Sequence, residues 1–143
     1  MRRLSIVLVA GAASWLLAAV AAEAQVIIDP SGPLCVGDGN TSSTYTARVT
    51  TNYNFKVRLT VYHNDVLKHD STTFITQSGP FYDFSKVVDH TGWGLAVNDR
   101  LNYHGRATIT AGPYRGQFDE KDWLVTVTSG TCRAVFARRE DVA

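Results

Sequence analysis

The chain has 143 residues, with 14 Lys and Arg, 13 Asp and Glu and a formal net charge of +1. A balance this close to neutral excludes the strongly basic surface expected of a protein that binds nucleic acid or anionic membranes. Hydrophobic residues make up 45% of the chain and aromatic residues 10%, which excludes a disordered chain and predicts one folded domain.

The first 24 residues have the features of a secretory signal peptide. Two arginines precede an uncharged, mostly apolar run from Leu4 to Ala22, and Ala22 and Ala24 have the spacing of a cleavage site. Cleavage after Ala24 removes two basic residues and one acidic residue, which leaves 12 of each. We therefore expect a secreted or periplasmic protein that has no membrane contact after cleavage. Because the apolar run approaches the roughly 20 residues that span a bilayer, an uncleaved signal anchor is the alternative.

The two cysteines, Cys35 and Cys132, lie near opposite ends of the mature chain. In an oxidising compartment such a pair forms a disulfide. Closing a loop of about 100 residues contributes about 4.7 kcal/mol in the chain-entropy model. The sequence has no CxxC motif and no third thiol, so we expect a structural bond without redox activity. Two free or intermolecular thiols are the alternative.

Period-2 alternation of apolar and polar residues recurs along the mature chain, and no segment shows sustained 3.6-residue periodicity, so the domain is predicted to be nearly all β. The first predicted strand runs from Val26 to Ile28 and ends at Asp29-Pro30. The second covers residues 43–51, with Tyr45, Ala47 and Val49 on one face and Thr46, Arg48 and Thr50 on the other. The third covers residues 55–62, with Phe55, Val57, Leu59 and Val61 inward and Lys56, Arg58, Thr60 and Tyr62 outward.

The turn after the third predicted strand decides the register of the fourth. A two-residue Asn64-Asp65 turn pairs Val61 with Lys68, which places a charge on the apolar face. A three-residue loop over residues 64–66 keeps polar residues beside polar ones, so we expect this loop. Its predicted pairs are Tyr62 with Lys68, Thr60 with Asp70, and Arg58 with Thr72.

Three more strands are predicted after this hairpin. Residues 80–90 alternate less clearly and lead into a loop or bulged edge at residues 90–94. Residues 99–110 form a long strand, with Leu101, Tyr103, Gly105, Ala107 and Ile109 inward and Arg100, Asn102, His104, Arg106 and Thr108 outward. A polar loop that includes Gly116, Asp119 and Glu120 precedes the last strand at residues 123–129. Residues 133–143 are predicted to form a flexible C-terminal tail.

The segment from Asp99 to Gly105 resembles a known strand signature. Its pattern Asp99-x-Leu101-x-Tyr103-x-Gly105 is similar to the sixth strand of the immunoglobulin-like β-sandwich superfamily, with Gly in place of that strand's cysteine. The resemblance implies a single all-β antiparallel sandwich of about seven strands over residues 25–132, with Tyr103 as a tyrosine corner bonded to upstream backbone. The chain departs from the pattern, with no cysteine in the second or sixth predicted strand and no tryptophan in the third. The resemblance therefore implies a fold and no activity, and an ordinary strand start is the alternative for Asp99 and Tyr103.

Common catalytic and metal-binding patterns are absent from the sequence, which has no GxSxG, HExxH, P-loop or dinucleotide-binding motif. Strand parity puts His63 and His104 on opposite faces of one sheet, so no convergent metal site is expected. The other two histidines, His69 and His90, are predicted on an edge and in a loop. The loops at residues 37–40 and 119–122 carry oxygen ligands without the order of a calcium loop, and residues 40–42 form a glycosylation sequon. We therefore expect neither an enzyme nor a cofactor.

The third and sixth strands are neighbours in the immunoglobulin-like fold that the resemblance implies, so their outward residues share a face. This candidate binding face consists of Lys56, Arg58, Tyr62, His104 and Arg106. It is predicted to be basic with an aromatic, and interfaces favour Arg and Tyr while guanidinium groups suit carboxylates and phosphates. We therefore expect a non-enzymatic module that binds a secreted protein or an anionic glycan. A solvated face without a partner is the alternative.

Two other functions remain open. A structural subunit would self-associate through a sheet edge, for which the irregular region at residues 72–90 is the predicted site. A small secreted enzyme or enzyme inhibitor would use residues around Trp93 and Trp123. The three functions differ in what they need from the molecule, namely an outer sheet face, an open edge or a pocket.

Overall fold

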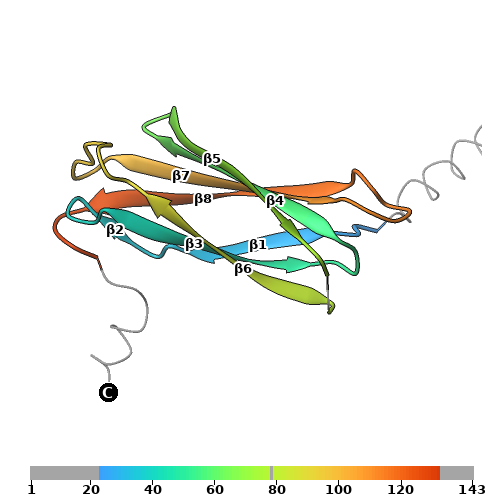
Figure 1. Ribbon diagram of the computed structural model, residues 1–143. Helices are drawn as coiled ribbons and strands as arrows, with labels where there is room; N and C mark the ends of the chain where they lie inside the picture. Colours follow the sequence, from blue (N-terminus) through green and yellow to red (C-terminus); the bar gives the residue numbers. More distant parts are fainter. Residues whose placement is uncertain (1–22, 78, 133–143) are drawn as a thin grey trace, which may run out of the picture.

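The computed structural model describes residues 23–77 and 79–132, and every regular element in this part of the chain is a β-strand (Figure 1). The strands are β1 (Ile27–Gly32), β2 (Val36–Gly37), β3 (Ser42–Thr50), β4 (Phe55–His63), β5 (Val66–Ile75), β6 (Phe81–Asp89), β7 (Arg100–Ile109) and β8 (Phe118–Thr128). The all-β prediction is confirmed. About seven strands were expected, and the additional one is the two-residue β2, which is too short to show alternation. The predicted tail, and the predicted leader except Glu23 and Ala24, lie outside the described residues. Within the described residues, no helix has the length and apolar character needed to cross a bilayer.

The strands form two sheets, one in the order β1-β3-β6 and one in the order β2-β8-β7-β4-β5. The short β2 runs parallel to β8, and all other neighbouring strands are antiparallel. Figure 1 shows the three-stranded sheet below β4, β5, β7 and β8. Because β4 and β7 are direct neighbours, the predicted adjacency of the third and sixth strands is confirmed.

The core lies between the two sheets and follows the predicted parity of β3, β4 and β7. All the predicted inward residues of these strands are buried, and Val57 and Ile109 are 0% and 1% exposed. The Tyr45 ring stacks on Tyr103 with ring centroids 6.2 Å apart and meets Phe84 edge-on. Burying a large apolar side chain contributes about 1.5–3 kcal/mol, so the alternation decides which face of each sheet is turned away from water.

The hairpin between β4 and β5 combines features of both turns weighed from the sequence. Its turn has two residues, Asn64 and Asp65, with φ values of 46° and 69°, as a tight hairpin with right-handed strand twist requires. The register shifts after Val61, so that Lys68 is an extra residue and Tyr62 pairs with Leu67. The predicted Tyr62–Lys68 pair and the three-residue loop are therefore wrong, because a bulge absorbs the additional residue. Beyond the bulge, the predicted pairs Thr60–Asp70 and Arg58–Thr72 are confirmed.

Two strands are longer than their alternation indicated. β1 continues through Asp29 and Pro30 to Gly32, with an irregular register after Pro30. Proline is tolerated there because β1 is an edge strand and needs no donor on its free side. β8 begins at Phe118, so Asp119 and Glu120, predicted in a loop, lie within a strand. This extension of β8 places its acidic residues beside β7.

The predicted disulfide between Cys35 and Cys132 is confirmed. It lies where β2 pairs with the end of β8, and the Asn40 side chain accepts hydrogen bonds from the backbone of Gly37 and Cys132 at 2.7 and 2.9 Å. Asp38 accepts a similar bond from the Gly130 backbone. The oxygen ligands of the loop at residues 37–40 thus bind backbone N–H groups, and the described residues contain no cluster of three or more potential metal-ligating side chains.

Candidate functional site

The outer face of the five-stranded sheet carries all five residues predicted as the binding face. In the register of β4 and β7, Arg58 pairs with Arg106 and Thr60 with His104. Lys56 and Tyr62 lie one step further along the same face in either direction, opposite Thr108 and Asn102. Directly paired residues of an antiparallel sheet project to the same side, so these side chains form one continuous surface.

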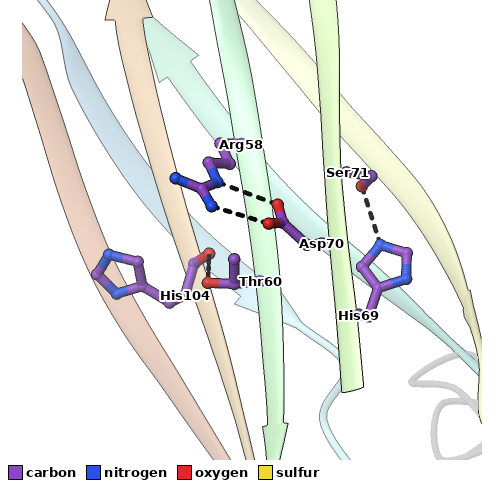
Figure 2. Close-up of polar contacts among 6 residues, drawn as sticks. All are labelled: Arg58, Thr60, His69, Asp70, Ser71 and His104. Carbon is purple, nitrogen blue, oxygen red and sulfur yellow. Dashed lines mark hydrogen bonds and ion pairs between the residues drawn. The ribbon is translucent and has the colours of Figure 1, made fainter. Parts of the chain in front are cut away.

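Carboxylates from the flanking strands balance the charge of this surface. Arg58 donates from Nε and Nη2 to the two carboxylate oxygens of Asp70 on β5, at 3.0 and 2.8 Å (Figure 2). Glu120 and Asp122 reach the face from β8, opposite Arg106 and His104. The face is therefore mixed in charge, and the expectation of a basic face is wrong because it considered β4 and β7 without their neighbours.

His104 lies between two carboxylates. Its Nδ1 is 2.7 Å from Asp122 Oδ1 and its Nε2 is 2.9 Å from Glu120 Oε1. Burial of the ring opposes its charging, but the hydrogen bonds to Asp122 and Glu120 outweigh burial and raise the pKa of His104 above its ordinary value. In the charged imidazolium both nitrogens are donors, so each carboxylate accepts one hydrogen bond. The backbone carbonyl of His104 also accepts a long bond from Thr60 Oγ1 (Figure 2).

Large apolar side chains stand at the ends of the same face. Phe74 on β5 and Phe118 on β8 lie at one end, paired with Lys56 and Thr108, and are 72% and 47% exposed. The Lys56 ammonium lies 5.8 Å from the Phe74 ring centroid, and the Arg106 guanidinium lies 3.6 Å from that of Phe118. The other end carries two exposed leucines, Leu67 beside Tyr62 and Leu124 beside Asn102.

A shallow depression of about 130 Å³ opens at the centre of this face. Its lining side chains are Arg58, Thr60, Tyr62, His104 and Arg106. The Nε atom of Arg106 is buried and has no hydrogen-bond partner in the described part of the chain. Four of the five predicted face residues thus line one hollow, and Thr60 is the lining residue that the sequence interpretation left out. The alternation of β4 could have identified it, because Thr60 lies between Arg58 and Tyr62 on the same outward parity.

The remaining histidines occupy structural positions. His69 on the edge strand β5 hydrogen-bonds Ser71 at 2.9 Å (Figure 2). His63 contacts the Asp99 carboxylate at 2.7 Å, on the opposite side of the sheet from His104, as predicted. His90 follows β6, as predicted for a loop residue, but it is buried, and its Nε2 is 2.7 Å from Ser43 Oγ. Burial lowers the pKa of His90.

Tyr103 is not a tyrosine corner. Its hydroxyl lies 2.6 Å from Ser43 Oγ on β3, and this bond crosses from one sheet to the other instead of returning to upstream backbone. Burial raises the pKa of Tyr103 to about 12, so the phenol stays neutral. Ser43 thereby links Tyr103 and His90 in one buried polar cluster.

The two tryptophans considered for an enzyme or inhibitor site are packed against the protein. The Trp93 ring lies between His63 and His90, with centroid distances of 6.4 and 5.1 Å. Trp123 lies in β8, as predicted for the last strand, and its indole N–H donates to the Pro33 carbonyl at 2.7 Å. A cavity of about 410 Å³ does lie beside the disulfide, lined by β3 hydroxyls, Pro33 and Leu34, and neither tryptophan lines it.

No protein-family model matches the chain, and no curated protein or solved structure shows significant similarity to it. A function therefore has to be inferred from the side chains themselves. The outer face of the five-stranded sheet is where charged, aromatic and apolar groups gather.

Proposed function

We propose that the chain is a secreted or periplasmic, non-enzymatic module with an immunoglobulin-like fold that binds a partner protein through the outer face of its five-stranded sheet. The observation that carries the proposal is the composition of this face, in which Arg58 and Arg106 lie at the centre and Tyr62, Phe74 and Leu124 lie towards the ends. Arg and aromatic residues dominate the energetic centres of protein interfaces.

Three features support the immunoglobulin-like assignment. The two sheets have the strand orders β1-β3-β6 and β2-β8-β7-β4-β5, with β3 and β7 in different sheets. The Asp99-to-Gly105 motif leads into and occupies β7. Gly105, which stands in place of a cysteine, lies against the Tyr45 hydroxyl from β3, between the strands that the superfamily's inter-sheet disulfide joins.

The Cys35–Cys132 disulfide supports the proposed compartment. Disulfides form and persist in secreted and periplasmic proteins and are reduced in the cytosol. Together with the signal-like pattern of the first 24 residues, the bond favours export.

The test is binding to an array of secreted proteins before and after Phe74→Glu with Leu124→Glu. Both substitutions place a charge on an exposed apolar side chain of the face, so we expect binding to fall by at least about tenfold. Val87→Glu is the matched control, because Val87 is 61% exposed on β6 of the other sheet. Equal binding by the wild type, the Phe74→Glu/Leu124→Glu variant and the Val87→Glu control would show that this face is not the binding surface.

Self-association through a sheet edge is a second candidate, because β5 and β6, one edge strand from each sheet, carry exposed apolar side chains. These are Val66, Leu67, Phe74, Phe81, Tyr82 and Val87. Unpaired strand edges with apolar side chains are templates for pairing between chains. Light scattering over a concentration series separates the two candidates: a binding module stays monomeric, and an assembling subunit grows in mass.

A further inference from the structure

The depression between β4 and β7 has an unusual lining, since all five of its side chains carry hydrogen-bond donors and none is acidic. The carboxylates of the same face are already engaged outside it. Asp70 is bound by Arg58, while Glu120 and Asp122 both contact His104. Arg58, His104 and Thr60 therefore have acceptors within the protein, at Asp70, at Asp122 and Glu120, and at the His104 carbonyl. Arg106 and Tyr62 are the lining residues whose donors are left for another molecule.

Arg106 is the cation in this lining that forms no ion pair within residues 23–77 and 79–132. Its guanidinium carbon lies 3.6 Å from the centroid of the Phe118 ring, a cation–π contact that favours this position of the side chain. Its Nε is buried without an acceptor. A buried donor without a partner costs free energy, so Arg106 is the lining cation whose donors are not satisfied within the described residues.

We propose that this depression binds a single carboxylate, from an acidic side chain of the protein partner, with Arg106 as its main ligand. The proposal deepens the proposed function and rests on it for the source of the carboxylate. A guanidinium fork matches the two oxygens of a carboxylate in one plane. Tyr62 adds a hydroxyl group to the lining of the same hollow.

The charges around the hollow select one acidic group over a polyanionic chain. Asp70 cancels Arg58, and the two carboxylates at His104 exceed its single positive charge by one. Glu120 and Asp122 would repel the further negative groups of a sulfated or polyuronic glycan. The exposed Phe74, Phe118 and Leu124 around the charged centre instead fit an acidic side chain set in apolar protein surface.

The test uses sodium acetate as the probe and follows arginine Nε–H resonances by NMR at constant ionic strength. We expect a saturable shift at Arg106 and none at Arg48, which is the matched control. Arg48 also lies over an exposed phenylalanine, Phe81, but its Nε already donates to Asp83 at 2.9 Å. A linear or absent response at Arg106, or the same response at both arginines, would overturn the proposal.

Variants check the assignment. Acetate should also shift the resonances of Tyr62 and His104, which line the same depression, and Arg106→Gln should abolish these shifts. Arg106→Lys keeps the charge but loses the planar fork, so it should weaken acetate binding by about tenfold. Circular dichroism confirms that both variants fold, and retention of full acetate binding by a folded Arg106→Gln would contradict the site.

A heparin fragment is the third probe. Tighter binding of this polyanion than of acetate, lost in Arg106→Gln, would overturn the single-carboxylate selectivity. Acetate binding with no partner on the protein array would leave the depression as a carboxylate site and remove the proposed function, so the two failures are distinguishable.

Discussion

The Tyr45 hydroxyl on β3 occupies the space that a side chain at Gly105 on β7 would fill. A Cβ built at Gly105 overlaps this hydroxyl and comes within 3.0 Å of the ring carbon that carries it. The hydroxyl is buried and has no hydrogen-bond partner in the described residues, and burial raises its pKa to about 12. The two sheets therefore come close together at this point because the Tyr45 ring of one packs against the backbone of Gly105 in the other.

We expect Gly105→Ala to destabilise the protein by about 1–3 kcal/mol, because overpacking displaces a rigid ring. Tyr45→Phe removes an unpaired buried hydroxyl, so by itself it should be neutral or stabilising. In the double variant it should recover part of the loss. Urea denaturation measures all three, with Gly79→Ala as the control, since no atom lies within 4 Å of a Cβ at Gly79. Equal effects of the two Gly→Ala changes would show that the close approach is unimportant.

The β4–β5 turn gives a second prediction. Asp65 has a φ of 69°, a region that glycine adopts freely and β-branched residues avoid. Asp65→Gly should therefore be close to neutral, whereas Asp65→Val should destabilise the protein by about 1–2 kcal/mol. Thermal denaturation of the two variants is the measurement, and a Val variant as stable as the Gly variant would contradict the two-residue turn.

The outer face illustrates how far alternation predicts a site. β4 and β7 have uninterrupted period-2 patterns, so the positions of Arg58, His104 and Arg106 on one face follow from parity. Their ion pairs do not, because the carboxylates arrive from β5 and β8. The register of β5 near the turn depends on the bulge at Lys68. β8 begins at Phe118, in a stretch whose many charged residues are typical of a loop.

Contacts between the two sheets also cannot be predicted from the alternation within one strand. Parity predicts that Tyr103 is inward, but it does not give the residue opposite it in the other sheet. Ser43, which accepts or donates the bond to Tyr103, lies 60 positions away along the chain. The local Asp-x-Leu-x-Tyr motif predicted a bond to nearby backbone, whereas the packing of β3 against β7 places Ser43 within 2.6 Å of the Tyr103 hydroxyl.

The disulfide gives a third prediction, because it closes a loop with a sequence separation of 97. Replacing both Cys35 and Cys132 by Ser should destabilise the protein by about 2–5 kcal/mol, since the unfolded chain gains freedom. Urea denaturation of the oxidised protein and the double variant measures the difference. The intact protein should also have a mass about 2 Da below that of the fully reduced chain, and alkylation of both thiols without reductant would contradict the bond.

The last prediction concerns His104, whose pKa is raised by its hydrogen bonds to Asp122 and Glu120 in spite of burial. A group with a raised folded-state pKa stabilises the protein fully below its unfolded pKa of about 6.5, and this contribution disappears as pH rises through the folded-state pKa. His90, buried without a carboxylate contact of this kind, shifts in the opposite direction. NMR titration of the imidazole resonances should therefore show His104 losing its proton at a higher pH than His90.

Asp122→Asn with Glu120→Gln isolates the cause. The substitutions keep the size of each side chain and remove the charges, so the pKa of His104 should fall while that of His90 stays the same. The free energy of unfolding should differ most between wild type and variant at pH values of about 5–6 and should converge at alkaline pH, because the imidazole is then neutral in both proteins. A stability difference that grows with increasing pH would show that the carboxylates act through something other than the charge of His104.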